Sequence, residues 1–114
     1  MRKVEVALNE NKIKSEGKYS LEAIYNALDE SFIEYASMQK QQQADGTIIY
    51  FAPKMIDENH YAKIWLAIDA CAEEQWLVEN ALKYLYGDTY ESDNPDDYSI
   101  EDILEEFEIG KSVY

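Results

Sequence analysis

Residues 20–36, SLEAIYNALDESFIEYA, carry the strongest secondary-structure signal in the chain. Ser20 is a good N-cap, because its hydroxyl can accept a hydrogen bond from an otherwise unpaired backbone N–H. Apolar residues then recur at helical spacing and form one stripe: Leu21, Ile24, Tyr25, Leu28, Phe32 and Tyr35. The segment predicts an amphipathic helix over 20–36, with Glu22, Asp29 and Glu34 on its solvated side.

Short segments on either side of this helix predict an antiparallel sheet. Apolar and polar residues alternate over 2–8, as in a half-buried strand. The Asp-Gly pair at 45–46 signals a hairpin that joins strands over 38–43 and 47–52. The glutamine-rich first strand of this hairpin could equally be an extension of the preceding helix. The polar segment 9–19 predicts a loop.

Residues 57–87 leave two interpretations open, because a strand and a helix both fit the apolar positions of the first half. Its alanines and its few β-branched residues favour a helix over 57–73, with Asp57 or Asn59 as the cap. A second apolar stripe further on is about half a turn out of phase with the first, given 3.6 residues per turn. We therefore expect two helices, the second over 76–86, or one helix that is kinked near Glu74 and Gln75.

The last part of the chain, 88–108, is an acidic C-terminal segment. Ser99 is a candidate N-cap, and Asp102 stands at the capping-box position. The apolar residues behind them have helical spacing: Ile100, Ile103, Leu104 and Phe107. This pattern predicts a short amphipathic helix over 100–108.

These elements together predict an α+β fold in a single domain over 1–114, close to the commonest domain size. We expect a small antiparallel sheet of about three strands packed against three to four helices. The predicted order of elements is β-α-β-β-α-α-α.

Charge is the most unusual feature of the composition, since the formal net charge is −14. Residues 1–18 carry five basic and three acidic side chains, whereas residues 19–114 carry five basic and 21 acidic ones. Such a field repels phosphate backbones and anionic lipid, so we expect neither direct nucleic-acid binding nor membrane binding. It favours a basic protein partner. The alternative is that the charge serves solubility alone.

The candidate partner-binding surface is the acidic C-terminal segment, where tyrosines stand among carboxylates. Arginine and lysine side chains of a partner could form ion pairs and cation–π contacts there. The candidate residues are Asp88, Glu91, Asp93, Asp96, Asp97, Tyr98, Glu101, Asp102, Glu105 and Glu106.

Catalytic and metal-binding motifs are missing from the sequence. It contains no P-loop, dinucleotide-binding, zinc-protease or nucleophile-elbow pattern. The EF-hand spacing fails when counted from Asp88 or from Asp93. His60 is the only histidine and Cys71 the only cysteine, too few for a zinc site, and Cys71 fits a small buried residue better than a nucleophile. We expect a non-enzymatic protein without cofactor or metal.

Two further features bear on the compartment. No apolar run approaches the roughly 20 residues that span a bilayer, and the N-terminal MRKVEV is not followed by an apolar signal region. A single cysteine excludes an internal disulfide. We therefore expect a cytoplasmic protein.

Three segments carry a resemblance to a group of known proteins: EGKYSLEAIYNALDE (16–30), DGTIIY (45–50) and YGDTYESDNPDDYSIEDILEEF (86–107). In these the chain resembles small accessory proteins of conjugative elements of Gram-positive bacteria. The resemblance implies a mobile-element setting, where small acidic proteins often counter host defences, including antirestriction and anti-CRISPR proteins that imitate DNA. It implies no catalytic residues.

Two function hypotheses follow from the charge and from this resemblance. The first is an acidic protein-binding module that occupies a basic, nucleic-acid-binding surface of its partner. The alternative is a structural or scaffolding protein, for example a homodimer in which apolar groups such as Trp65 or Trp76 form the contact.

Overall fold

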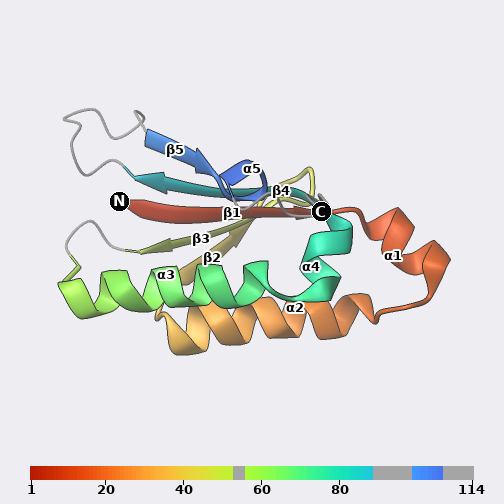
Figure 1. The fold of residues 1–114 in the computed structure, drawn as a ribbon, viewed down its shortest axis with the longest axis horizontal. Coiled ribbons are helices and arrows are strands. Elements are labelled where there is room, and N and C mark those ends of the chain that lie inside the picture. Colours follow the sequence, from red (N-terminus) through yellow and green to blue (C-terminus); the bar gives the residue numbers. More distant parts are fainter. Residues whose placement is uncertain (53–55, 89–98, 107–114) are drawn as a thin grey trace, which may run out of the picture.

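The computed structural model describes residues 1–52, 56–88 and 99–106, which form an α+β fold (Figure 1). Its sheet is antiparallel throughout, has the strand order β2-β3-β1-β4-β5 and contains five strands rather than about three. The strands are β1 (Arg2–Leu8), β2 (Gln39–Gln42), β3 (Ile48–Ala52), β4 (Ala81–Asp88) and β5 (Ser99–Asp102). The N-terminal strand is therefore the central one.

Helices cover one face of this sheet, where α3 and the continuous α2–η1 segment run side by side (Figure 1). The segment η1 is a π-helix that continues α2 without a break. The helices are α1 (Glu10–Glu16), α2 (Leu21–Asp29), η1 (Glu30–Tyr35), α3 (Glu58–Ala72), α4 (Gln75–Asn80) and α5 (Ile103–Glu106).

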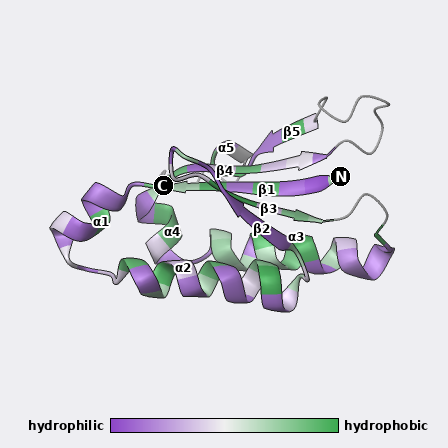
Figure 2. Cartoon of the chain, turned by 180° about the vertical axis from the view of Figure 1, so that it is seen from behind, coloured by the Kyte–Doolittle hydropathy of each residue, from purple (hydrophilic) through white to green (hydrophobic). Residues whose placement is uncertain are grey.

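The predictions for the two long helices and for the hairpin are confirmed. Ser20 Oγ accepts a hydrogen bond from the Ala23 N–H over 3.3 Å, and Asp57 Oδ1 accepts one from the His60 N–H over 2.8 Å. The strand interpretation of residues 57–73 is wrong. β2 and β3 lie within the predicted hairpin strands, and β2 is exposed and hydrophilic along its length (Figure 2).

The loop predicted over 9–19 is wrong, because α1 occupies most of it. Asn9 Oδ1 caps this helix by accepting from the Lys12 N–H over 3.2 Å. Gly17, with φ at +63°, ends it in the left-handed conformation that glycine adopts without a Cβ penalty. Only Ile13 is buried, so the helix has no apolar stripe that sequence periodicity could detect.

The helix predicted over 76–86 is also wrong in its second half. α4 ends at Asn80, and β4 begins with the next residue. β4 pairs with β1 on one side and with β5 on the other, so its backbone groups are satisfied within the sheet. Tyr84 and Tyr86, two residues apart, both point into the core, as the period of a strand requires.

The helix predicted over 100–108 is replaced by β5 and the short α5. Ser99 does not cap a helix but begins β5, opposite Asp88. Asp102 is the residue before α5, and its Oδ1 accepts from the Glu105 N–H over 3.3 Å. The pairing of β5 with the edge of β4 supplies backbone hydrogen bonds that an isolated helical turn would lack. Residues 107 and 108 lie outside the described residues.

Aromatic residues join the sheet to the helices across the core. Phe32 of η1 stacks on Tyr50 of β3 with ring centroids 4.8 Å apart, and Trp65 of α3 meets Tyr86 of β4 at the same distance. The Tyr50 hydroxyl donates to Asp29 over 2.7 Å. These contacts fix where α2–η1 and α3 lie on the sheet, and therefore fix the surface between them.

Candidate protein-binding surface

The described residues of the predicted C-terminal site lie at the β4–β5 edge of the sheet. Asp88 ends β4 and is not an open docking group, because Arg2 Nε lies 3.0 Å from its carboxylate. The Arg2 guanidinium in turn stacks over the ring of Tyr61, 4.5 Å from its centroid. We conclude that Asp88 ties the first strand to β4 and α3.

The structure places three more predicted site residues, Glu101, Asp102 and Glu105, in exposed positions on β5 and α5. Glu101 lies opposite Tyr86, and Asp102 lies opposite Leu85. The other predicted residues are outside the described part of the chain: Glu91, Asp93, Asp96, Asp97 and Tyr98. Glu106 ends α5, and its side chain is likewise outside the description.

A second acidic surface lies on the helix layer, and only its part on the first helix, with Glu22 and Glu34, was predicted as a solvated side. The outer sides of α2–η1 and α3 carry exposed carboxylates, and Lys63 is the single basic residue within these segments. The exposed carboxylates on these segments are Glu22, Glu30, Glu34, Glu58 and Asp69, and Glu73 follows directly after α3. Two helical segments distant in sequence thus both carry exposed carboxylates, and we call their outer sides the acidic face of the helix layer.

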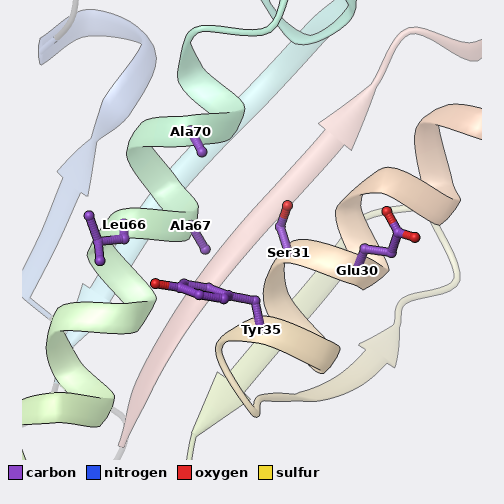
Figure 3. A pocket seen from close by; sticks show the side chains of 6 residues that line it. All are labelled: Glu30, Ser31, Tyr35, Leu66, Ala67 and Ala70. Atoms are coloured by element: carbon purple, nitrogen blue, oxygen red, sulfur yellow. The ribbon is translucent and has the colours of Figure 1, made fainter.

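An apolar groove of about 410 Å³ runs between η1 and α3 within this acidic face (Figure 3). Its lining residues are Glu30, Ser31, Tyr35, Leu66, Ala67 and Ala70. The Tyr35 ring reaches from η1 toward α3, and the two alanine methyl groups project toward η1 (Figure 3). Tyr35 is 46% exposed and Leu66 is 55% exposed, so two large apolar side chains border the groove at the surface.

The π-helical turn explains why Tyr35 lies at this surface rather than on the predicted core stripe. The buried positions of this segment are spaced by four: Ile24, Leu28, Phe32 and Ala36. In an ideal α-helix each such step overshoots a full turn by about 40°. The wider turn of η1, with its Ala36 N–H to Ser31 O bond of 3.1 Å, absorbs this overshoot. The residues spaced by four therefore stay on the buried side of the segment, and Tyr35 is displaced toward the surface.

Small residues on α3 make the groove hollow. Ala67 is buried and Ala70 is exposed, and neither side chain extends beyond a methyl group. Lys63 Nζ lies 5.8 Å from the Tyr35 ring centroid, in cation–π range, at the end of the groove nearest the start of α3. The hollow is therefore bordered by aromatic and aliphatic side chains and has a cation at one end.

Cys71 and His60 do not form a catalytic pair. His60 is in the first turn of α3, and Cys71 is eleven residues later, about 16 Å along the helix axis. The His60 Nε2 lies 2.6 Å from the Ala36 carbonyl oxygen instead. Cys71 is 2% exposed, and burial raises the pKa of its thiol, which keeps it protonated and unreactive.

Metal-binding clusters and membrane-spanning helices are both absent from the described residues, 1–52, 56–88 and 99–106. They contain no group of three or more histidine, cysteine, aspartate and glutamate side chains that could hold a metal ion. None of their helices combines the length and the apolar character needed to cross a bilayer.

Comparison with known proteins gives no relative. No protein-family model matches the chain, and no curated protein or solved structure matches it significantly. The features that bear on function are therefore the geometry and the charge of the two acidic surfaces.

Proposed function

We propose that this chain is a non-enzymatic module that binds a positively charged protein. The observation that carries the proposal is the acidic face of the helix layer, where α2–η1 and α3 carry exposed carboxylates and enclose an apolar groove lined by Glu30. Protein interfaces combine an apolar centre with a polar rim, and complementary charge directs which partner docks. The carboxylates of β5 and α5 form the other acidic surface, at the β4–β5 edge of the sheet.

The sharpest version of this proposal is that the partner surface normally binds nucleic acid. A net charge of −14 gives the chain the sign of a phosphate backbone, so a surface built to bind phosphates would attract it. The mobile-element setting implied by the resemblance of residues 16–30, 45–50 and 86–107 supports an antirestriction or anti-CRISPR role. The same charge argues against direct binding of nucleic acid.

A second candidate function is a scaffolding homodimer. Exposed large apolar side chains favour it, since Leu66, Leu82 and Ile100 are 55%, 65% and 49% exposed. Leu82 lies on β4 and Ile100 on β5. Such a dimer would be nearly insensitive to salt, because its contact would be apolar.

The proposal is tested by affinity capture from a nuclease-treated Gram-positive bacterial lysate, washed at low and then at moderate salt. We expect capture of a basic nucleic-acid-binding protein, its release by salt, and its displacement by added DNA. Screening over about 10 Å at 0.1 M salt is the reason for the release.

Two charge-matched triple variants show which acidic surface is used. One neutralises the helix layer with Glu30→Gln, Glu34→Gln and Asp69→Asn. The other neutralises the C-terminal surface with Glu101→Gln, Asp102→Asn and Glu105→Gln, where asparagine keeps the capping oxygen. We expect the first variant to lose the partner and the second to retain it. Equal capture by both variants and the native chain would contradict an electrostatic function.

A further inference from the structure

We propose that the groove between η1 and α3 receives the apolar side of a basic amphipathic helix from the partner protein. This inference rests on the proposed function, because it specifies which element of a basic partner this surface recognises. In helix-in-groove recognition an amphipathic helix places apolar anchor residues in a hydrophobic furrow. The apolar lining of this groove and the carboxylates on its two helices fit that mode, with room for one central anchor residue.

The furrow is as long as about one turn of a helix. Its α3 wall runs from Leu66 to Ala70, which is about 6 Å along the helix axis. The hollow over Ala67 and Ala70 is open enough for a leucine or phenylalanine side chain of the partner, since both residues end in a methyl group (Figure 3). Tyr35 and Leu66 would flank that side chain.

The charges around the furrow decide the kind of helix. Glu30 lines the furrow on the η1 side, and Glu34, Asp69 and Glu73 are exposed elsewhere on η1, on α3 and directly after α3. The ion pairs described for this chain use other carboxylates: Glu5, Asp29, Glu79 and Asp88. The carboxylates around the groove are therefore placed to meet lysine or arginine side chains that flank an apolar stripe.

The same charges disfavour two other occupants. A second copy of the chain would bring an equally acidic helix layer against this one, and like charges facing each other oppose docking. A nucleic acid would meet the same repulsion between its phosphates and the carboxylates.

The test uses two labelled synthetic peptides of about 14 residues, which is long enough for a helix to extend beyond the furrow at both ends. Both contain the same leucines and lysines. In the first the leucines form one helical stripe, and in the second the order is scrambled so that charge is kept and the stripe is lost. Affinity is measured by fluorescence anisotropy against the full chain and its variants at low salt.

The deciding variant is Ala70→Trp, which fills the groove at an exposed position. Ala44→Trp, in the exposed turn between β2 and β3, is the matched control. Circular dichroism and thermal unfolding establish that both variants fold. We expect Ala70→Trp to weaken binding of the striped peptide by about tenfold or more, as loss of a central anchor does. Ala44→Trp should leave it unchanged.

The outcomes separate this inference from the function it rests on. If both peptides bind equally and Ala70→Trp has no effect, the groove inference is wrong while binding of basic partners stands. If neither peptide binds at low salt, the proposed function fails as well. If sedimentation shows a dimer of the native chain that Ala70→Trp converts to a monomer, the occupant is a second copy and the inference is overturned.

Discussion

The His60 imidazole holds the start of α3 to the end of η1, because its Nε2 lies 2.6 Å from the carbonyl oxygen of Ala36. Ala36 comes directly after the π-helix, and Ser37 behind it has φ at +55°, an uncommon conformation for a residue with a Cβ. The Met38 N–H then bonds the Phe32 carbonyl oxygen over 2.8 Å. The His60 contact thus joins α3 to the end of the π-helical segment.

Replacing His60 by alanine should therefore loosen the junction between η1 and α3. We expect His60→Ala to lower the free energy of unfolding by about 1 kcal/mol, the usual net contribution of such a hydrogen bond. His60→Gln can still donate from its amide and should recover part of the loss. Urea unfolding measures both variants, and an unchanged midpoint for His60→Ala would show that the contact adds no stability.

The buried hydroxyl of Tyr84 makes a second prediction. It donates to the Ile68 carbonyl oxygen over 2.7 Å, and burial raises the pKa of Tyr84, so the donor stays protonated in the folded chain. Tyr84→Phe should cost about 1 kcal/mol. Tyr35→Phe, which alters an exposed ring, is the control and should change stability by about 0.5 kcal/mol or less. If both variants lowered the stability equally in thermal unfolding, the Tyr84 hydrogen bond would not be a specific source of stability.

Glu79 makes a prediction about pH. Lys18 Nζ lies 2.7 Å from its Oε1, and the Tyr19 hydroxyl donates to its Oε2 over 2.5 Å. The hydrogen bond from Lys18, and then that from Tyr19, lower the pKa of Glu79 from 4.5 to about 2. Because the folded-state pKa is the lower one, the carboxylate stabilises the fold above about pH 4.5 and loses this effect as the pH falls toward about 2.

Glu79→Gln should therefore be less stable than the native chain at pH 7, and the difference should shrink as the pH falls below about 4.5. Urea unfolding at a series of pH values measures this. Glu16→Gln, at an exposed position of α1, is the control and should show no such trend. A difference that is constant over pH 2–7 would mean that the effect is not due to ionisation of Glu79.

Phe32 anchors the π-helix, since its buried ring stacks on Tyr50. Phe32→Ala should cost about 3–5 kcal/mol, because it removes a large core side chain and leaves a cavity. Leu66→Ala, at a side chain 55% exposed, should stay within about 0.5 kcal/mol of the native chain. A small loss for Phe32→Ala in chemical unfolding would show that the ring is not part of a packed core.

The helices that local signals describe were predicted well. Ser20 and Asp57 cap α2 and α3 as expected, because a cap depends only on residues three positions away. The predicted apolar stripe of the first helix is confirmed up to Phe32. It is wrong at Tyr35, because the π-helical segment η1 turns that side chain away from the core. No periodicity argument that assumes 3.6 residues per turn can detect such a change.

The strands of the second half were missed because their pairing is non-local. Residues 81–88 have apolar positions that a helix also fits, and only the register with β1 makes them a strand. β5 is exposed at all four residues, so it shows no alternation that would indicate a strand. The predicted acidic site was placed on the C-terminal segment for its composition alone. The groove between η1 and α3 was not predicted, because it joins residues more than 30 positions apart.

The sequence by itself determined the acidic net charge, the lack of catalytic motifs, the capped helices and the α+β class, because composition, caps and periodicity are local properties. Tertiary structure alone decided that Arg2 meets Asp88, that residues 81–88 form a strand, and that Tyr35 lies outside the core. Those outcomes depend on backbone pairing and packing between distant segments, which outweigh local preference once the core is formed.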